Sequence, residues 1–143
     1  MAYKFGDFDN NDKRTNISVD KMIIINLPLL PPSVNTIWVN IPKGRRMSDK
    51  GKLFKQQAYY MIKEQYKGQM LEDFVRVSIE LYFKTKHKRD IDNYNKAILD
   101  SLNGTILVDD SQIVELNVKK FIGTGKDEIK IRIEKAERWI LKE

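Results

Sequence analysis

The chain has 143 residues, of which 41% are hydrophobic and 32% charged, a composition typical of one soluble globular domain. It contains no cysteine and one histidine, which excludes disulfides, thiolate zinc sites, cysteine nucleophiles and multi-histidine metal sites within one chain. The net charge of +6 suits a polyanionic partner such as nucleic acid, but it equally suits a basic, solubilising surface.

Residues 1–20 are polar and predict a flexible leader ahead of a single domain that spans residues 21–143. The leader lacks the basic-then-apolar layout of a signal peptide, and no apolar run in the sequence is long enough to cross a bilayer. We therefore expect a cytoplasmic protein that has no membrane partner.

The first half of the chain predicts two strands, a helix and a third strand. Residues 21–27 and 35–41 are strand candidates, and a basic loop follows the second of them. Ser48 is a plausible N-cap for a helix over residues 49–66. The apolar positions expected to face the core from this helix are Leu53, Phe54, Ala58, Met61 and Ile62. Residues 74–84 alternate between apolar and polar, which is the strongest strand signal in the chain.

The second half predicts another helix over residues 93–103, with Gly104 where a helix C-terminus favours positive φ. A short strand at residues 106–108 follows, and alternating strands at residues 114–118 and 129–133 are joined by a hairpin-type turn at residues 123–128. This order, β-β-α-β-α-β-β-β, predicts an α/β or α+β fold in which two helices flank a small mixed sheet.

Aspartates gather around the second predicted helix, against the basic bias of the chain. Asp90 and Asp92 precede the helix, and extended backbone would place both side chains on one face. Asp109 and Asp110 follow a short apolar run beyond it, where active-site loops gather in sheet proteins. Neighbouring carboxylates repel unless protons or a cation hold them, and Mg²⁺ prefers such oxygen ligands. Two metals so held can activate water and stabilise the leaving oxygen in phosphodiester hydrolysis.

Lys96 lies four residues after Asp92, so on a helix both side chains would point the same way and the lysine could contact a scissile phosphate. A surface ion pair with Asp92 or Asp100 is the plainer alternative. The aspartates could likewise serve as caps and turns. An EF-hand is excluded, because calcium loops started at Asp90 or Asp7 lack the glycine and the final glutamate.

The segment 88–120 resembles the signature of the RusA family of Holliday junction resolvases, which are associated with phages and prophages. That signature combines Asp-x-Asp-Asn, a lysine four residues after the second aspartate, Asp-Ala/Ser-Leu-Asn-Gly and Asp-Asp-x-Gln. The chain matches it at residues 90–93 (DIDN), Lys96, residues 100–104 (DSLNG) and residues 109–112 (DDSQ). Residues 31–35 (PPSVN) resemble the family's early proline-serine-asparagine stretch, and the likeness covers roughly residues 22–135. Tyr94 and Asn95 stand where many members carry apolar residues.

The resemblance implies an Mg²⁺-dependent endodeoxyribonuclease that resolves Holliday junctions in DNA recombination and repair by paired, symmetric cuts. It implies that Asp90, Asp92 and Asp110 are the catalytic metal-binding aspartates, that Lys96 is the essential lysine and that Asp109 has a secondary role. Because a four-way junction has two strands to cut symmetrically, it also implies a homodimer. The alternatives are a broader branched-DNA nuclease, a non-catalytic DNA-binding protein and a structural phage protein.

Basic residues on both sides of the acids are candidates for holding the phosphates of the junction arms. Such contacts would give salt-sensitive affinity without sequence information. The candidates are Lys43, Arg45, Arg46, Lys84, Lys86, Lys88, Arg89, Lys119 and Lys120. Five aromatic residues are expected in the core or in a dimer interface, namely Trp38, Tyr59, Tyr60, Phe74 and Phe83.

Overall fold

A four-stranded mixed sheet carries the fold in the computed structural model, which describes residues 22–137. The strand order is β1-β6-β4-β5, with bounds β1 Met22–Leu27, β6 Glu128–Lys135, β4 Val75–Tyr82 and β5 Ile113–Phe121. β5 runs parallel to β4, and the other neighbours are antiparallel. This confirms the predicted mixed α+β class, while the predicted leader lies outside the described residues.

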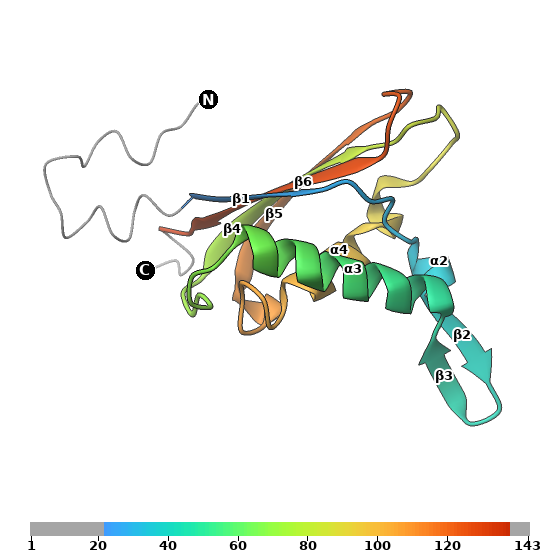
Figure 1. The fold of residues 1–143 in the computed structure, drawn as a ribbon, viewed down its shortest axis with the longest axis horizontal. Helices are drawn as coiled ribbons and strands as arrows, with labels where there is room; N and C mark the ends of the chain where they lie inside the picture. The colour runs from blue at the N-terminus through green and yellow to red at the C-terminus, as the bar shows by residue number, and fades with distance from the viewer. Residues whose placement is uncertain (1–21, 138–143) are drawn as a thin grey trace, which may run out of the picture.

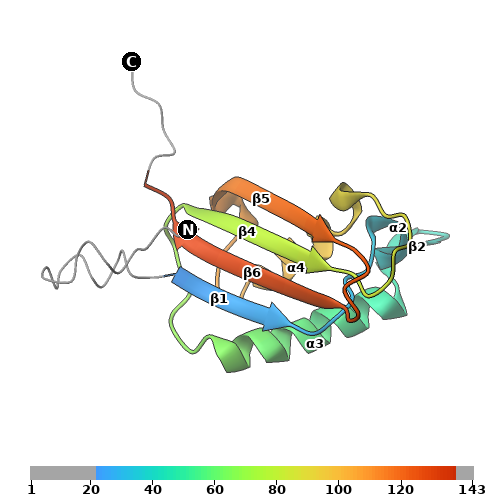
Figure 2. The same ribbon diagram turned by 90° about the horizontal axis from the view of Figure 1, so that it is seen from above.

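Helices α3 (Asp49–Gln65) and α4 (Asn95–Leu102) both lie against one face of the sheet (Figure 1, Figure 2). The alternation of β4 explains this arrangement, because its apolar side chains point to the helices and are at most 1% exposed. The opposite face carries the polar side chains of the strand. In the described part of the chain, no helix is long and apolar enough to span a membrane.

The long helix α3 begins as predicted. The Ser48 hydroxyl accepts a hydrogen bond from the Gly51 N–H at 3.1 Å and so caps the helix. Phe54, Ala58 and Ile62 are buried, but Leu53 is 55% exposed, so its predicted place in the core is wrong. Neighbouring positions on a helix lie about 100° apart, and a stripe centred on Phe54 and Ala58 turns Leu53 outward.

Residues 34–47 differ from the prediction of one strand and a loop. Residues Val34–Ile37 form the single helical turn α2, because the Ser33 carbonyl accepts hydrogen bonds from the N–H groups of Thr36 and Ile37. Strands β2 (Trp38–Ile41) and β3 (Gly44–Met47) then pair as a hairpin that projects beyond the end of α3 (Figure 1). The predicted basic loop is therefore one arm of this hairpin.

The predicted hairpin between β5 and β6 is wrong. The two strands do not pair, because β6 inserts between β1 and β4 while β5 pairs with β4 alone. The connecting segment instead crosses the end of β4, where N–H groups of Gly123 and Thr124 donate to the carbonyls of Thr85 and Phe83. The glycines in this turn allow the chain to reverse, but the turn does not decide which strand β6 joins.

Residues 106–108 do not form the predicted strand. Leu107 makes isolated bridges to Leu71 and Asn103, and its carbonyl accepts a hydrogen bond from the Gly104 N–H at 2.7 Å. Gly104 has φ +80°, which confirms the positive φ predicted after the helix.

The predicted placement of the aromatic residues is confirmed only in part. Phe83 is fully buried in the core, but Tyr59, Tyr60 and Phe74 are exposed, so they are not core residues of this chain. Their predicted place in a dimer interface stays a prediction.

Candidate active site

Helix α4 joins the two segments that carry the acidic pairs. The connection from β4 to β5 runs through the 3-10 turn η1 (Ile91–Asn93), then α4, then the 3-10 turn η2 (Asp110–Gln112). Both turns contact α4, and η1 also contacts β5. Ile98 and Leu102 fix the helix on the sheet, since both are fully buried. The fold therefore places both acidic segments in contact with one short, well-anchored helix.

The backbone around Asp90 and Asp92 corrects two expectations. Asp90 is extended, with φ −88° and ψ 130°, but Asp92 lies inside η1, so the two do not share one extended stretch. Asp92 neither caps α4 nor lies on it, because Tyr94 is the N-cap residue and the helix starts at Asn95. The Tyr94 ring packs on Phe83, with centroids 5.1 Å apart, which anchors this turn on the core.

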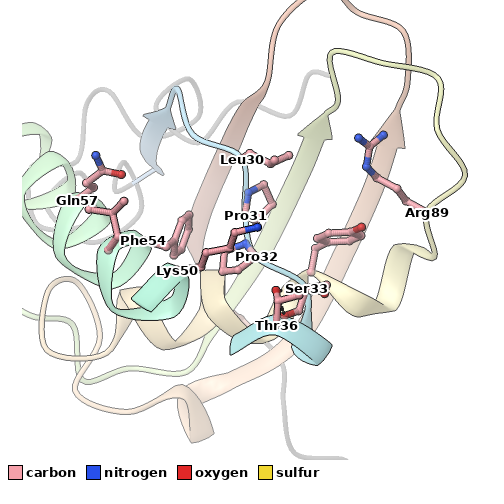
Figure 3. Close-up of a pocket in the computed structure, with 11 residues that line it drawn as sticks. Leu30, Pro31, Pro32, Ser33, Thr36, Lys50, Phe54, Gln57 and Arg89 are labelled. Atoms are coloured by element: carbon pink, nitrogen blue, oxygen red, sulfur yellow. Dashed lines mark hydrogen bonds between the residues drawn. The ribbon is translucent and has the colours of Figure 1, made fainter. Parts of the chain in front are cut away.

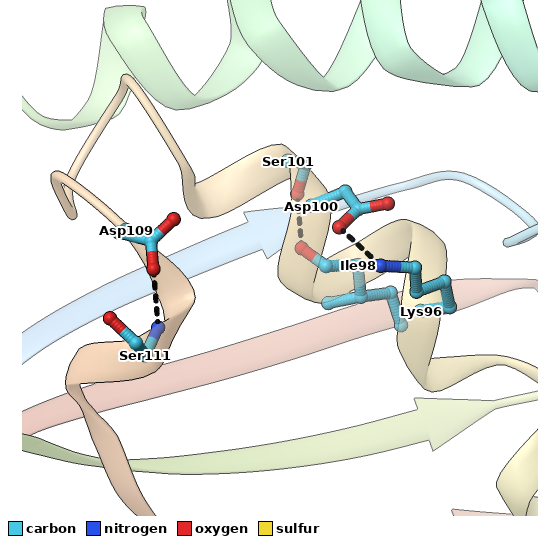
Figure 4. A network of polar contacts seen from close by, with 6 residues as sticks. All are labelled: Lys96, Ile98, Asp100, Ser101, Asp109 and Ser111. Atoms are coloured by element: carbon cyan, nitrogen blue, oxygen red, sulfur yellow. Dashed lines mark hydrogen bonds and ion pairs between the residues drawn. The ribbon is translucent and has the colours of Figure 1, made fainter.

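Lys96 forms the plainer of the two predicted contacts. Its Nζ lies 3.2 Å from Oδ1 of Asp100, one helical turn later (Figure 4). The lysine side chain is 55% exposed, so water screens the pair. The predicted alignment of Lys96 with Asp92 on one helix is wrong, because η1 interrupts the helical spacing.

Asp109 forms a cap at the start of η2. Its Oδ2 accepts a hydrogen bond from the Ser111 N–H at 3.0 Å (Figure 4). The Gln112 side chain in turn accepts one from the Asp109 N–H at 2.9 Å. Hydrogen bonds from the side chain and then the backbone of Ser111 hold the pKa of Asp109 below its usual value. Gln112 also donates to the carbonyls of Leu71 and Asp73, which fixes η2 on the loop before β4.

Three carboxylates differ from that of Asp109, namely those of Asp90, Asp92 and Asp110. No residue that the structure describes donates a hydrogen bond to them or forms an ion pair with them. Oxygen donors without a protein partner are the chemistry that a hard divalent cation requires. Within residues 22–137, no three acidic or histidine side chains form a group that could hold a metal ion. The donor types therefore fit Mg²⁺, and they come from two separate segments: Asp90 precedes η1, Asp92 lies in it, and Asp110 begins η2.

The basic segment before Asp90 is fixed in place. The Arg89 guanidinium lies 4.4 Å from the centre of the Phe83 ring and donates to Oγ1 of Thr85 at 3.1 Å. The Arg89 carbonyl accepts a hydrogen bond from Nζ of Lys120, which lies on β5. These contacts hold the backbone that leads into Asp90.

The other predicted DNA contacts divide between two faces of the molecule. Lys86 and Lys88 are exposed in the same loop as Arg89. Lys120 pairs in register with the buried Leu81 and so lies on the helix side of the sheet, whereas Lys119 pairs with Glu80 and lies on the open face. The structure therefore separates Lys119 from Lys120.

The hairpin that carries three of the predicted DNA contacts lies next to α4. Lys43, Arg45 and Arg46 are exposed, and the Arg45 guanidinium packs over Trp38 at 5.3 Å. Below the hairpin, a cavity of about 330 Å³ is lined by residues of the hairpin, of α3 and of α4, including Asp100, the partner of Lys96. The hairpin thus adjoins the helix that carries the candidate lysine.

A second cavity, which we call the Arg89 cavity, was missed by the sequence reasoning. It measures about 360 Å³ and lies between the segment after β1, α2, the first half of α3 and the loop before Asp90 (Figure 3). Its lining includes Lys50, Gln57, Arg89 and Tyr94. The proline-serine stretch at residues 31–33 forms one wall, and its likeness to the family signature was the one signal that pointed here.

Comparison with known proteins settles the family. The family model described as Endodeoxyribonuclease RusA matches residues 28–134 of the chain. The chain belongs to the RusA family. This confirms the predicted family and the predicted class of enzyme, a hydrolase that acts on DNA phosphodiester bonds.

Three relatives show how far the RusA likeness extends. The chain is 30% identical over 126 residues to the crossover junction endodeoxyribonuclease RusA of Aquifex aeolicus (strain VF5). This match covers 82% of the chain and 94% of the Aquifex protein. It is 26% identical over 108 residues to the crossover junction endodeoxyribonuclease rusA of Enterobacteria phage HK97, with 75% and 90% covered. A stretch of 34 residues is 56% identical to the uncharacterized protein YqaN of Bacillus subtilis (strain 168), covering 24% of each.

Proposed function

We propose that this RusA-family chain is an Mg²⁺-dependent endodeoxyribonuclease that resolves Holliday junctions by cutting two opposed strands symmetrically. The observation that carries the proposal is a set of three carboxylates that have no partner among residues 22–137, in two segments that contact one helix. Relatives named as crossover junction endodeoxyribonucleases support the choice of substrate.

Asp90, Asp92 and Asp110 are the proposed ligands of the metal. When bound, Mg²⁺ supplies activation of water and stabilisation of the leaving oxygen. Asp109 has a secondary role, because its carboxylate caps η2 and so orients the neighbouring Asp110. Bringing these carboxylates together requires a cation to offset their mutual repulsion, which a divalent ion would supply.

Lys96 is proposed to neutralise charge at the scissile phosphate. Its present partner, Asp100, is a partly exposed surface contact, and such pairs contribute at most about 1 kcal/mol. Exchange of that carboxylate for a phosphate oxygen therefore costs little. Asp100 holds the ammonium on α4 until DNA arrives.

Positive charge around the site would hold the DNA. The hairpin next to α4 carries Lys43, Arg45 and Arg46. The loop that leads into Asp90 carries Lys86, Lys88 and Arg89, and Lys120 supports this loop. Lys119 points to the open face of the sheet and would contact DNA only where the substrate wraps around that edge. We propose that these residues bind phosphates and give little sequence information.

A homodimer follows from the same proposal, because symmetric cutting of two strands requires two sites related by a two-fold axis. A role in DNA recombination and repair follows from the proposed substrate, and a cytoplasmic location is part of the same proposal.

A panel of DNA substrates tests the proposed specificity. Purified protein with Mg²⁺ is incubated with a labelled four-way junction and, in parallel, with a flap, a fork and a linear duplex of shared sequence. We expect cutting of the junction and not of the duplex. Equal cutting of flaps and forks would favour a broader branched-DNA nuclease, and binding without cutting in any metal would favour a non-catalytic DNA-binding protein.

A further inference from the structure

The Arg89 cavity combines the features of a site for one nucleotide. Pro31 and Phe54 supply apolar surface, Tyr94 supplies an aromatic ring, and Gln57 supplies an amide that can both donate and accept hydrogen bonds (Figure 3). Its volume, about 360 Å³, lies in the range of about 300–1,000 Å³ that is typical of small-molecule sites. A nucleobase stacks on such surfaces, whatever its identity.

Two cations give the cavity a preference for an anion. Lys50 lines it from the first turn of α3, and Arg89 lines it from the loop before Asp90. No carboxylate among the described residues lies within ion-pair distance of either side chain. Their charge is therefore available to a phosphate, and uncompensated cations facing a cavity are typical of a site that receives one.

Arg89 is held in position before any ligand arrives. Its guanidinium donates to Thr85 and packs on Phe83, so little side-chain entropy is lost when a phosphate binds. The next residue along the chain is Asp90, a proposed metal ligand. Anything bound by Arg89 in the cavity therefore contacts the residue that immediately precedes Asp90.

We propose that the Arg89 cavity receives one unstacked nucleotide of the cut strand, next to the scissile phosphate. The proposal rests on the proposed junction-cleaving function and names the part of the substrate that this site recognises. Extruding a nucleotide costs least where pairing is already broken, as at the centre of a branched DNA. Occupancy of the cavity would fix the strand relative to Asp90 and Asp92 and so select the bond that is cut.

The direct test places 2-aminopurine, whose fluorescence is quenched by stacking, at successive positions of the junction strand near the crossover. Wild-type protein is added in EDTA, so that the DNA is bound and not cut. We expect fluorescence to rise at one position, adjacent to the bond that Mg²⁺-containing reactions show to be cut.

Two variants with matched controls test the assignment of the cavity. Lys50→Met removes one charge and Gln57→Leu removes the amide, and both side chains lie on the exposed surface of α3. Lys52→Met and Gln56→Leu make the same changes on the same helix outside the cavity. We expect the cavity variants to lose the fluorescence rise and to cut roughly tenfold or more slowly in single turnovers, as expected for a misplaced strand. The controls should behave like the wild type.

The outcomes separate this inference from the proposed function. If the wild type cuts the junction but no position brightens, or if the cavity variants match their controls, the inference is wrong and the nuclease function stands. If the wild type cuts no DNA with Mg²⁺, the proposed function fails, and the fluorescence scan in EDTA still decides whether the cavity takes a nucleotide.

Discussion

Asp90, Asp92 and Asp110 differ from Asp109 in what their carboxylates contact. The first three have no hydrogen-bond or ion-pair partner among the described residues, while Asp109 is engaged by Ser111. Substituting a residue that stabilises the fold lowers the free energy of unfolding, whereas substituting a residue that only supplies charge to a site does not. The four aspartates can therefore be separated by experiment.

Asp92→Asn and Asp110→Asn should leave the free energy of unfolding of the metal-free protein within about 0.5 kcal/mol of the wild type, because no described contact is lost. Both variants should lose the rise in melting temperature that Mg²⁺ gives the wild type. Asp73→Asn, at a surface carboxylate that pairs with Lys135, is the control and should keep the rise. A normal response to Mg²⁺ in Asp92→Asn would remove that residue from the metal site.

Asp109 should titrate below the usual value for aspartate, about 3.9, in a carboxyl-detected NMR titration of the folded protein. A carboxyl group whose pKa is lower in the folded state than in the unfolded state stabilises the fold at pH values above its unfolded-state pKa. That contribution is lost as the pH falls through the folded pKa. Ser111→Ala removes the hydroxyl and keeps the backbone N–H, so the pKa should rise part of the way to normal, and an unchanged value would contradict the assigned cause.

At the scale of elements, the first turn of α3 positions the hairpin. Gly51 allows the helix to pass close to the end of β3, since a Cβ built at this residue would lie 2.8 Å from Cγ of Met47 and 3.0 Å from the carbonyl oxygen of Ile37. That carbonyl accepts a hydrogen bond from the Ser48 N–H, so it is not free to move. The hairpin and the helix cap thus depend on one glycine.

Gly51→Ala should destabilise the protein by about 1–3 kcal/mol through overpacking, although alanine is favoured over glycine in a helix by about 1 kcal/mol. Urea unfolding measures the change. Lys52→Ala, on the exposed side of the same turn, should change stability little. A stabilised Gly51→Ala variant would show that α3 and the hairpin are not in close contact.

Local signals in the sequence were enough to predict several elements but not their partners. The alternation of β4 and the hydroxyl of Ser48 act within a few residues, so both were predictable. The pairing of β6 between β1 and β4 depends on contacts that are distant in sequence, which a turn signal cannot encode. The Arg89 cavity was missed for the same reason, since four separate segments line it.

The acidic set shows the same division. The spacing and the family resemblance were enough to select Asp90, Asp92, Lys96 and Asp110 as candidates. The 3-10 turn that removes Asp92 from α4 was not predictable from spacing, because a single turn of this kind satisfies the same local pattern as the start of a helix.

At the scale of the whole molecule, the net charge of +6 favours DNA in general. The hairpin, which projects at one end of the molecule (Figure 1), carries the exposed cations Lys43, Arg45 and Arg46. Replacing Lys43, Arg45 and Arg46 with glutamine should weaken junction binding. It should also make the negative slope of log association constant against log salt concentration less steep, by about 1 per lost phosphate contact. The control is a second triple variant with the same change in charge. In it, glutamine replaces Lys52 and Lys63 of α3 and Lys67 of the segment after it. Equal loss in both triple variants would indicate a general charge effect and no hairpin contact.

The central claim is that Asp90, Asp92 and Asp110 form the metal site of a junction-resolving nuclease. The most direct measurement is cleavage of a four-way junction labelled separately on each strand, with wild type and Asp92→Asn compared in Mg²⁺ and in EDTA. We predict paired nicks at symmetric positions near the crossover for the wild type in Mg²⁺ alone. Asp92→Asn should bind the junction with unchanged affinity and leave it uncut. Symmetric cutting by Asp92→Asn, or by the wild type in EDTA, would contradict the account.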